Sequence, residues 1–330
     1  MERFKPIIRL ATAFDAENIC ALFNRVSPEY DRGTDFWLWI NRFIGKDNSI
    51  VVIVEFQEQV VGHYAIIPGD VVLDDKKYQV GFGIHAVIES EVNNLVSIFE
   101  VTNLAYKKAK ELGFKFIYGF PNENYRLIQQ KIERWHQIGL FNANEIDINK
   151  YLVKSDVDKY QVEKLTDSND SILSLAKTFD TKVNSNTKCY FEKSFLYYVN
   201  RYIKHPHKLY DSFLIKDKEG NSTIIFLKKF KDKKLLKGHI IDFIRQEKFS
   251  SEKIIDISVH ILKQEKVNLL SFWHVDKEIK QIFENRGLEP KGFNTFFGLK
   301  FLDKDFKKAH QDLLLDFDNW TLMMGDSDAF

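Results

Sequence analysis

Residues 78–122 read YQVGFGIHAVIESEVNNLVSIFEVTNLAYKKAKELGFKFIYGFPN, and this segment carries the most information about the fold. Apolar and polar side chains alternate from Tyr78 to Glu89, a pattern that predicts a strand. Apolar residues then recur at helical spacing from Leu95 to Leu112, and Gly113 is a typical residue to end that helix. Lys115 to Gly119 forms a short apolar run. The order strand, helix, strand predicts a parallel pair of strands joined by a crossover helix.

The chain on either side of this segment adds antiparallel strands and further helices. Upstream, strands are predicted at Ile7 to Leu10, Ile50 to Phe56 and Val60 to Pro68. Asp15 is a candidate N-cap for the helix that follows the first strand. Downstream, helical spacing of apolar residues predicts a helix from Tyr125 that ends before Gly139.

The second half repeats the order of hairpin, strand, long helix, short strand and short helix, although few residues are identical. A repeated pattern of this kind predicts two copies of one α/β unit. We place the copies at residues 1–145 and 146–330, joined by the polar stretch from Asn142 to Tyr160. The predicted fold class is α/β (α+β), with a mixed, mostly antiparallel sheet flanked by helices in each unit.

The composition excludes several classes of protein. The chain has 48 Lys and Arg against 47 Asp and Glu, so almost no net positive charge attracts nucleic acid. Its longest aliphatic run, Ile50 to Val54, is too short to span a membrane, and the N-terminal residues do not resemble a signal peptide. Cys20 and Cys189 form neither a disulfide framework nor a metal-binding pattern. We therefore expect a cytoplasmic protein with no metal site and no nucleic-acid partner.

Four motifs point to one family. They are the aromatic segment Phe36–Trp39, the segment Tyr118–Asn122 with the letters GFPN, the segment Phe195–Tyr202 followed by Pro206 and Tyr210, and the ending Trp320–Asp328 with the letters GDSD. Together with the order of elements, they resemble a tandem-domain branch of the GNAT N-acetyltransferases associated with bacterial surface polysaccharide biosynthesis. The resemblance implies that the N-terminal half transfers an acyl group from acetyl-CoA or another acyl-CoA to a small-molecule amine, such as an amino sugar or a sugar nucleotide.

In that family the central strands splay, the thioester pairs with the fourth strand, and the pyrophosphate lies on the N-terminus of the next helix. The resemblance implies that the coenzyme contacts Val87 and Ile88 on the strand, Asn94, Leu95, Ser97 and Ile98 at the helix start, and Asn122. The family's phosphate loop has a glycine and an arginine where this chain has Ser97 and Asn94, so no local cation is supplied. For Asn122, a helix cap is the alternative interpretation.

Three residues are candidates for proton transfer. An amine must lose a proton when it attacks a thioester, and Glu89 and His85, four residues apart on one strand, are candidate bases. Tyr125 is the candidate acid for the departing thiolate, because Trp135 stands where the family has its tyrosine. A solvated carboxylate and a half-buried imidazole are the alternative interpretations of Glu89 and His85.

Acceptor binding is expected at aromatic and acidic side chains. Trp37 and Trp39 are a candidate platform for stacking a sugar, with buried packing as the alternative. Phe120 belongs to the GFPN motif and is a further candidate. Asp326 and Asp328 are expected to reach a cleft between the halves, with a frayed terminus as the alternative.

Two other functions stay open at the level of sequence. The missing glycines of the phosphate loop fit a protein of the same fold that has lost its donor site and binds a ligand or partner instead. An aminoacyl-transferase that uses charged tRNA would need a basic surface, which the balanced charge does not supply. The sequence does not define the oligomeric state.

Overall fold

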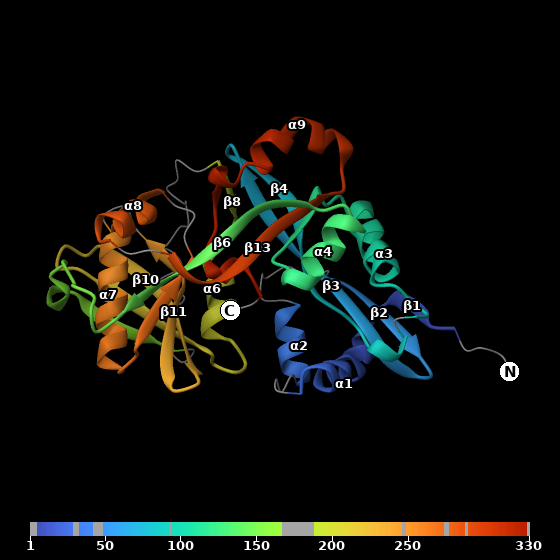
Figure 1. The fold of residues 1–330 in the computed structure, drawn as a ribbon, viewed down its shortest axis with the longest axis horizontal. Coiled ribbons are helices and arrows are strands. Elements are labelled where there is room, and N and C mark those ends of the chain that lie inside the picture. The colour runs from blue at the N-terminus through green and yellow to red at the C-terminus, as the bar shows by residue number, and fades with distance from the viewer. Residues whose placement is uncertain are drawn as a thin grey trace. The chain divides into compact units, whose positions relative to one another are not determined.

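The computed structural model describes residues 5–28, 33–41, 49–92, 94–166, 188–245, 249–273, 277–287 and 290–328. The chain divides into two compact units (Figure 1). Unit 1 comprises Met1–Ile138 and Phe296–Leu315, and unit 2 comprises Gly139–Thr295 and Asp316–Phe330. Among the helices of the described residues, none combines the length and the apolar character needed to cross a lipid bilayer.

Unit 1 contains a mixed sheet, and among its described strands the parallel neighbours are β4 and β5. Its strands, in spatial order, are β1 (Ile7–Leu10), β2 (Ile50–Phe56), β3 (Gln59–Leu73), β4 (Lys76–Ile88), β5 (Phe116–Gly119) and the end of β13 (Pro290–Phe301). Its helices are α1 (Ala16–Val26), α2 (Thr34–Ile40), α3 (Ile98–Glu111), α4 (Glu123–Lys131) and α9 (Lys304–Leu314). Helix α3 joins the parallel pair, as the sequence predicts.

Unit 2 repeats this arrangement. Its strands, in spatial order, are β7 (Gln161–Leu165), β9 (Tyr210–Lys216), β10 (Ser222–Asp232), β11 (Leu235–Arg245), β12 (Leu269–Phe272) and the end of β6 (His136–Asp147). Among these described strands β11 and β12 are the parallel neighbours, and α7 (Ser251–Gln264) joins them. The unit also contains α6 (Phe195–Tyr198), α8 (Lys277–Asn285) and the short strands β8 (Cys189–Phe191) and β14 (Trp320–Thr321).

Strands β6 and β13 carry the chain from one unit to the other. β6 follows α4, yet its residues Asn144–Asp147 pair with β12. β13 follows α8, and its residues Gly298–Phe301 pair with β5. Helix α9 then packs in unit 1, where the ring of Phe306 lies 5.0 Å from that of Tyr78 on β4. The compact units therefore differ from the expected ranges 1–145 and 146–330, because residues 296–315 complete the first unit.

Helix α4 is shorter than predicted. It ends at Lys131, and Arg134 has a φ of 58°, a left-handed value that turns the chain away from the helix direction. Trp135 leads into β6, so Gly139 is a strand residue and does not follow a helix. β6 also takes up residues 142–147 of the expected linker. The predictions of a helix up to Gly139 and of a linker from Asn142 are wrong in these parts.

Helices cover both faces of the unit 1 sheet, and strand β3 shows why. Successive side chains of a strand point to opposite faces. The ring of His63 packs on Phe23 of α1, with centroids 4.9 Å apart, whereas the next residue, Tyr64, packs on Tyr106 of α3 at 5.9 Å. Helices α1 and α3 therefore lie on opposite sides of β3, as they do in Figure 1.

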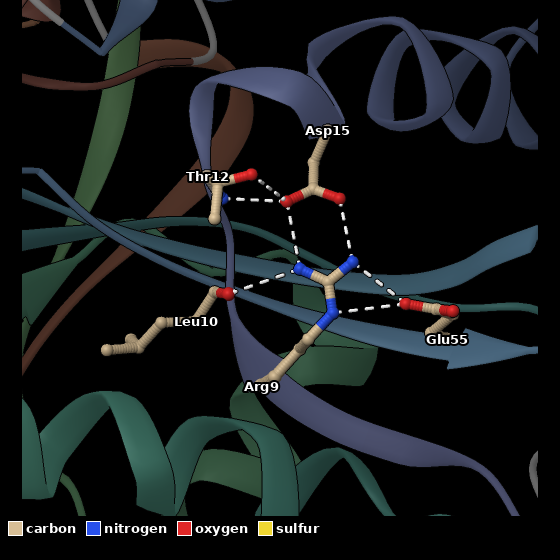
Figure 2. A network of polar contacts seen from close by, with 5 residues as sticks. All are labelled: Arg9, Leu10, Thr12, Asp15 and Glu55. Atoms are coloured by element: carbon tan, nitrogen blue, oxygen red, sulfur yellow. Dashed lines mark hydrogen bonds and ion pairs between the residues drawn. The ribbon is translucent and has the colours of Figure 1, made fainter.

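Arg9 fastens the first strand to the neighbouring elements (Figure 2). Its guanidinium donates to both oxygens of Asp15, at 2.9 and 2.8 Å, and twice to Glu55 of β2, at 3.0 and 2.8 Å. Asp15 occupies the N-cap position of α1, as predicted, but its carboxylate accepts from Thr12 and Arg9 and makes no capping bond. The Arg9 hydrogen bonds hold the pKa of Asp15 well below its ordinary range, although burial opposes them.

This depressed pKa makes the contribution of Asp15 dependent on pH. A carboxylate whose pKa is lower in the folded state stabilises the fold above its unfolded pKa, and the contribution is lost as the pH falls toward the folded value. We expect Asp15→Asn to lower the free energy of unfolding by about 1.5–3 kcal/mol at pH 7 and by less at pH 3. Urea unfolding at both pH values measures this difference. An Asp15→Asn chain as stable as the wild type at pH 7 would contradict it.

Candidate functional site

Strand β4 contains one residue more than the stretch of β3 that it faces. The register leaves Tyr64 of β3 opposite two residues of β4, His85 and Ala86. This arrangement is a β-bulge, and the φ of His85 is 53°, which is uncommon for a residue other than glycine. A bulge bends its strand and increases the local twist. β4 therefore changes direction at His85.

The parallel pairing of β4 and β5 ends next to this bulge, and we call this place the point at which the two strands separate. Their parallel register covers only Gly81–Phe82 of β4 and Ile117–Tyr118 of β5. The next residue on each strand is a glycine. A Cβ on Gly83 would lie 2.3 Å from the hydroxyl oxygen of Tyr64, and a Cβ on Gly119 would lie 3.3 Å from the carbonyl oxygen of Gly83. Glycine is therefore required at position 83, because any side chain there would displace Tyr64.

Aromatic side chains with polar atoms fill the space behind the two glycines. Tyr64 reaches Gly83, and the ring of Trp135 would lie 3.6 Å from a Cβ on Gly119. The indole Nε1 of Trp135 donates to the hydroxyl of Tyr106 at 3.2 Å. Tyr64, Tyr106 and Trp135 are each at most 6% exposed. The point at which β4 and β5 separate is thus lined by a buried and partly polar layer.

Glu133 lies at the centre of this layer. The residue is 0% exposed, and its carboxylate accepts from the hydroxyl of Tyr106 at 2.6 Å. The hydroxyls of Thr102 and Tyr125 both donate to its Oε1, each at 3.1 Å. The ammonium group of Lys300 donates to the backbone carbonyl of Glu133 and lies 5.2 Å from the ring centre of Tyr106. Burying a carboxylate is costly unless it is hydrogen-bonded, and three hydroxyls meet that need here.

The tyrosines around Glu133 are held in their protonated form. Burial raises the pKa of Tyr64, Tyr106 and Tyr125, and the nearby charge of Glu133 raises each pKa further. At neutral pH these phenols are therefore hydrogen-bond donors. Because an ionised carboxylate only accepts, the hydroxyl protons of Tyr106 and Tyr125 point toward Glu133. This arrangement can hold and pass a proton.

Of the three predicted catalytic residues, only Tyr125 belongs to this layer. It lies on α4 and is half-buried. Glu89 and His85 both face helix α1. The carboxylate of Glu89 accepts from the Nε of Arg25 at 2.7 Å, and the ring of His85 lies 5.2 Å from that of Phe23. Glu89 is therefore engaged in an ion pair on the side of the sheet away from α3.

Sequence reasoning missed Glu133, Tyr106 and Tyr64. Glu133 lies in the run Lys131–Arg134, where a solvated carboxylate is the ordinary expectation. Tyr106 is one of several residues on the apolar face of α3, and Tyr64 is one of several in a long strand. Nothing in the sequence distinguishes them, because their role depends on which side chains the fold brings together.

The helix after β4 begins later than the sequence predicts. Its N-cap is Ser97 and its first residue is Ile98, while Asn94 and Leu95 lie exposed in the preceding turn. The Ser97 hydroxyl accepts from the amide of Glu100 at 3.4 Å, and the Glu100 carboxylate accepts from the amide of Ser97 at 2.8 Å. This reciprocal pair is a capping box. A carboxylate thus occupies the end of α3 where the sequence predicts a phosphate.

The remaining residues expected at the coenzyme have clear structural roles. Val87 and Ile88 form the end of β4 and pair with β3. Asn122 is the N-cap of α4, where its side chain accepts from the amide of Tyr125 at 2.9 Å. The interpretation of Asn122 as a helix cap is confirmed.

Trp37 and Trp39 do not share one face. They lie two residues apart on the short helix α2, and residues at this spacing point to different sides. Trp37 is buried, with 8% exposure, whereas Trp39 is half-buried. A platform made of both rings is therefore wrong. Phe120, directly after β5, stacks on Phe297 with ring centroids 5.2 Å apart.

In unit 2 the C-terminal segment is tied to β11, the strand that corresponds to β4. Lys193 pairs with Asp242 of β11 and with Asp326 of the C-terminal segment, each at 2.8 Å. All three residues are at most 9% exposed. Burial opposes the charge on Lys193, but the two carboxylates hold its pKa well above the ordinary value. The carboxylate of Asp326 is therefore used inside unit 2, and the terminus is not frayed there. Asp328 is exposed.

Two of the sequence motifs meet at this ion pair. From the Phe195–Tyr202 motif, the hydroxyl of Tyr197 donates to the carbonyl of Gly325 at 3.1 Å. Arg201 of the same motif donates to the carbonyl of Ser327 at 2.5 Å. The Phe195–Tyr202 motif and the GDSD ending thus form one buried contact, and the C-terminal segment occupies the space beside β11.

The chain is similar to known proteins in structure but not in sequence. No protein-family model and no curated protein sequence matches the chain. A GCN5-related N-acetyltransferase from Anabaena variabilis has a TM-score of 0.65 at 12% identity, over 91% of this chain and 73% of its own. A probable N-acyltransferase from Enterococcus faecalis has a TM-score of 0.70 at 7% identity, over 92% and 74%. The chain has the GNAT fold.

A third similar structure contains a ligand. The N-myristoyltransferase of Saccharomyces cerevisiae, with bound myristoyl-CoA, has a TM-score of 0.58 at 10% identity, over 92% of this chain and 85% of its own. These likenesses extend over both units of the chain. The fold class predicted from the order of elements is therefore confirmed.

The buried ion pair of unit 2 leads to a test of stability. Lys193→Met would leave Asp242 and Asp326 buried without their cation, and we expect it to lower the free energy of unfolding by about 3–5 kcal/mol. Lys164→Met is the matched control, since the Lys164 side chain is 53% exposed and the expected loss is at most about 1 kcal/mol. Urea unfolding at pH 7 measures both. Equal losses in the two variants would show that the buried pair has no special role.

Proposed function

We propose that the protein is an N-acyltransferase, in which unit 1 takes an acyl group from acyl-CoA and transfers it to an amine. The observation that carries the proposal is the separation of β4 from β5 at Gly83, beside a bulge, in a chain with the GNAT fold. Separated strands expose backbone groups that are hydrogen-bonded elsewhere in a sheet. In our proposal the thioester of the donor lies against Val87 and Ile88 of β4.

The pyrophosphate of the coenzyme would bind at the start of α3. The first amides of a helix have no partner inside the helix, and the helix dipole favours an anion there. The amides of Ile98 and Phe99 are in this position. In the structure the Glu100 carboxylate already bonds to the amide of Ser97, so a diphosphate would meet a negative charge at this end.

Unit 2 is a poorer candidate for the coenzyme. The space beside β11 is occupied by the chain's own ending, which Lys193 ties to that strand. The corresponding helix α7 begins with Ser250 as N-cap, whose hydroxyl accepts from the amide of Lys253. We therefore assign acyl-CoA to unit 1 alone.

For the acceptor we propose a small-molecule amine of the amino-sugar or sugar-nucleotide type, as in the polysaccharide-associated branch that the motifs resemble. Trp39 and Phe120 are the aromatic candidates for its binding, since both are half-buried and Trp37 is not accessible. Cys20 and Cys189 are both buried and form no disulfide within the described part of the chain, which suits the cytoplasm that we propose as its compartment.

The proposal is tested by release of the coenzyme thiol. Acetyl-CoA and longer acyl-CoAs are supplied with a panel of amines that includes amino sugars and nucleotide-linked amino sugars, and the free thiol is followed. We expect amine-dependent release with at least one donor, and acyl-CoA should raise the melting temperature by binding the folded state. No thiol release and no change in melting temperature with any donor would contradict the proposal and leave a ligand-binding or partner-binding protein.

The capping box gives a sharper prediction for coenzyme binding. Glu100→Gln keeps a side chain that accepts from the Ser97 amide but removes the negative charge. We expect coenzyme A to bind about 2–5-fold more tightly to this variant, since a charge near a helix end contributes about 0.3–1 kcal/mol. Isothermal titration calorimetry at low ionic strength measures the dissociation constant.

Glu111→Gln is the matched control, because it removes one carboxylate at the opposite end of the same helix. Its dissociation constant should equal that of the wild type. An affinity of Glu100→Gln that is unchanged or weaker would place the diphosphate elsewhere.

A further inference from the structure

We propose that Tyr125 and Glu133 form a proton relay, which removes the proton from the attacking amine and later returns it to the departing thiolate. The inference rests on the proposed function and assigns its proton-transfer step. Tyr125 would be the catalytic residue that touches the reacting nitrogen. Glu133 would act through Tyr125, as the group that positions its hydroxyl and stores the proton.

The exposure of the two residues fits this division. Glu133 is 0% exposed and cannot meet a substrate directly. Tyr125 is half-buried, and its hydroxyl donates to Oε1 of Glu133 at 3.1 Å. Because this proton points inward, the lone pairs of the Tyr125 oxygen are available to accept a proton from outside. Tyr125 is thus oriented to accept first, whereas the sequence predicts it as an acid.

The other contacts of Glu133 hold it in place. Thr102 and Tyr106, one turn apart on α3, each donate a hydroxyl to the carboxylate, at 3.1 and 2.6 Å. Tyr106 in turn accepts from the indole of Trp135 at 3.2 Å. A carboxylate bound by three donors from two helices has little freedom to rotate. The distance between Oε1 of Glu133 and the Tyr125 hydroxyl is therefore fixed before the substrate binds.

The relay also lies beside the start of the β4 edge along which the donor would bind. The hydroxyl of Tyr64 reaches Gly83 and the ring of Trp135 reaches Gly119, the glycines at which β4 and β5 separate. Tyr64 is close enough to Tyr106 and Tyr125 to influence the pKa of both. Among the described residues the buried Tyr64 hydroxyl has no hydrogen-bond partner of normal geometry. The buried layer therefore reaches the separation point of both strands.

The alternative base is less suited to the task. The carboxylate of Glu89 is bound to Arg25 at 2.7 Å and lies toward α1, on the face of the sheet opposite to α3. In the part of the chain that the structure describes, the layer around Glu133 contains the phenols of Tyr64, Tyr106 and Tyr125 and the cation Lys300, which binds the backbone carbonyl of Glu133. No cation among these groups neutralises the carboxylate by direct contact.

The amine nitrogen attacks the thioester carbon, and as the N–C bond forms its proton moves to the Tyr125 oxygen while the Tyr125 proton moves to Oε1 of Glu133. When the tetrahedral intermediate collapses, the C–S bond breaks. The proton on Glu133 then returns through Tyr125 to the sulfur. The products are the amide and the thiol of coenzyme A, and Tyr125 and Glu133 regain their starting states.

Steady-state kinetics of Tyr125→Phe, Glu133→Gln and the double variant test the relay. We expect each single variant to lower kcat by about 100-fold or more, with the dissociation constant of coenzyme A changed less than about 3-fold. If the two residues act as one unit, the double variant should be no slower than the slower single variant. Glu123→Gln, an exposed carboxylate on the same helix, should keep the wild-type kcat.

The outcomes separate the relay from the proposed function. If the wild-type protein transfers acyl groups and Tyr125→Phe keeps the same kcat, the relay is overturned but the proposed function is not. If the wild-type protein transfers no acyl group, the proposed function is overturned. Multiplicative losses in the double variant would show two independent roles and also overturn the relay. Should Glu133→Gln fail to fold, Tyr125→Phe still tests the relay, because the substitution removes only the hydroxyl of a half-buried residue and leaves its ring in place. A loss of kcat in Glu89→Gln without one in Tyr125→Phe would restore Glu89 as the base.

Discussion

The extra residue in strand β4 is the feature on which the rest of unit 1 depends. Without the bulge, β4 would continue straight beside β5. Both edges of β4 would then be hydrogen-bonded to neighbouring strands. The bulge at His85 and Ala86 bends β4 after only two residues have paired with β5. Gly83 and Gly119 mark this point. A Cβ at position 83 would lie 2.3 Å from the Tyr64 hydroxyl oxygen, and one at position 119 would lie 3.3 Å, a tight contact, from the carbonyl oxygen of Gly83. One local departure from strand geometry thus creates both the exposed edge and the space behind it.

The two units have the same order of elements, but different side chains fill the corresponding space in each. In unit 1 the space behind the separated strands holds Glu133 and its hydroxyl donors. In unit 2 the register of β10 and β11 also shifts, between Phe226 and Leu227, and the adjoining space holds Lys193 and the chain's own ending. In unit 2, Asp242 and Asp326 share the buried cation Lys193, whereas Glu133 is bound by neutral hydroxyls. This contrast suits a structural role in unit 2 and a proton-transfer role in unit 1.

The sequence predicts the fold well because periodicity reports burial directly. The alternation from Tyr78 to Glu89 and the helical face from Leu95 to Leu112 appear in the structure as β4 and α3. Periodicity fails where a turn interrupts it, as at Arg134, and it cannot show that β13 pairs with β5. The site is predicted less completely. The sequence identifies Tyr125 as a candidate for proton transfer. It does not identify Glu133, which lies in a polar run and is buried only through tertiary packing. Trp37 and Trp39 point to different sides of the short helix α2, which their closeness in the sequence does not show.

Hydrogen–deuterium exchange of the backbone amides, with and without coenzyme A, tests most directly whether the separated edge of β4 is the donor site. The account predicts slower exchange confined to the end of β4, from Gly83 to Ile88, and to the first turn of α3, from Ile98 to Glu100. Protection that leaves both segments unchanged, or that appears instead along β11 and α7, would contradict it.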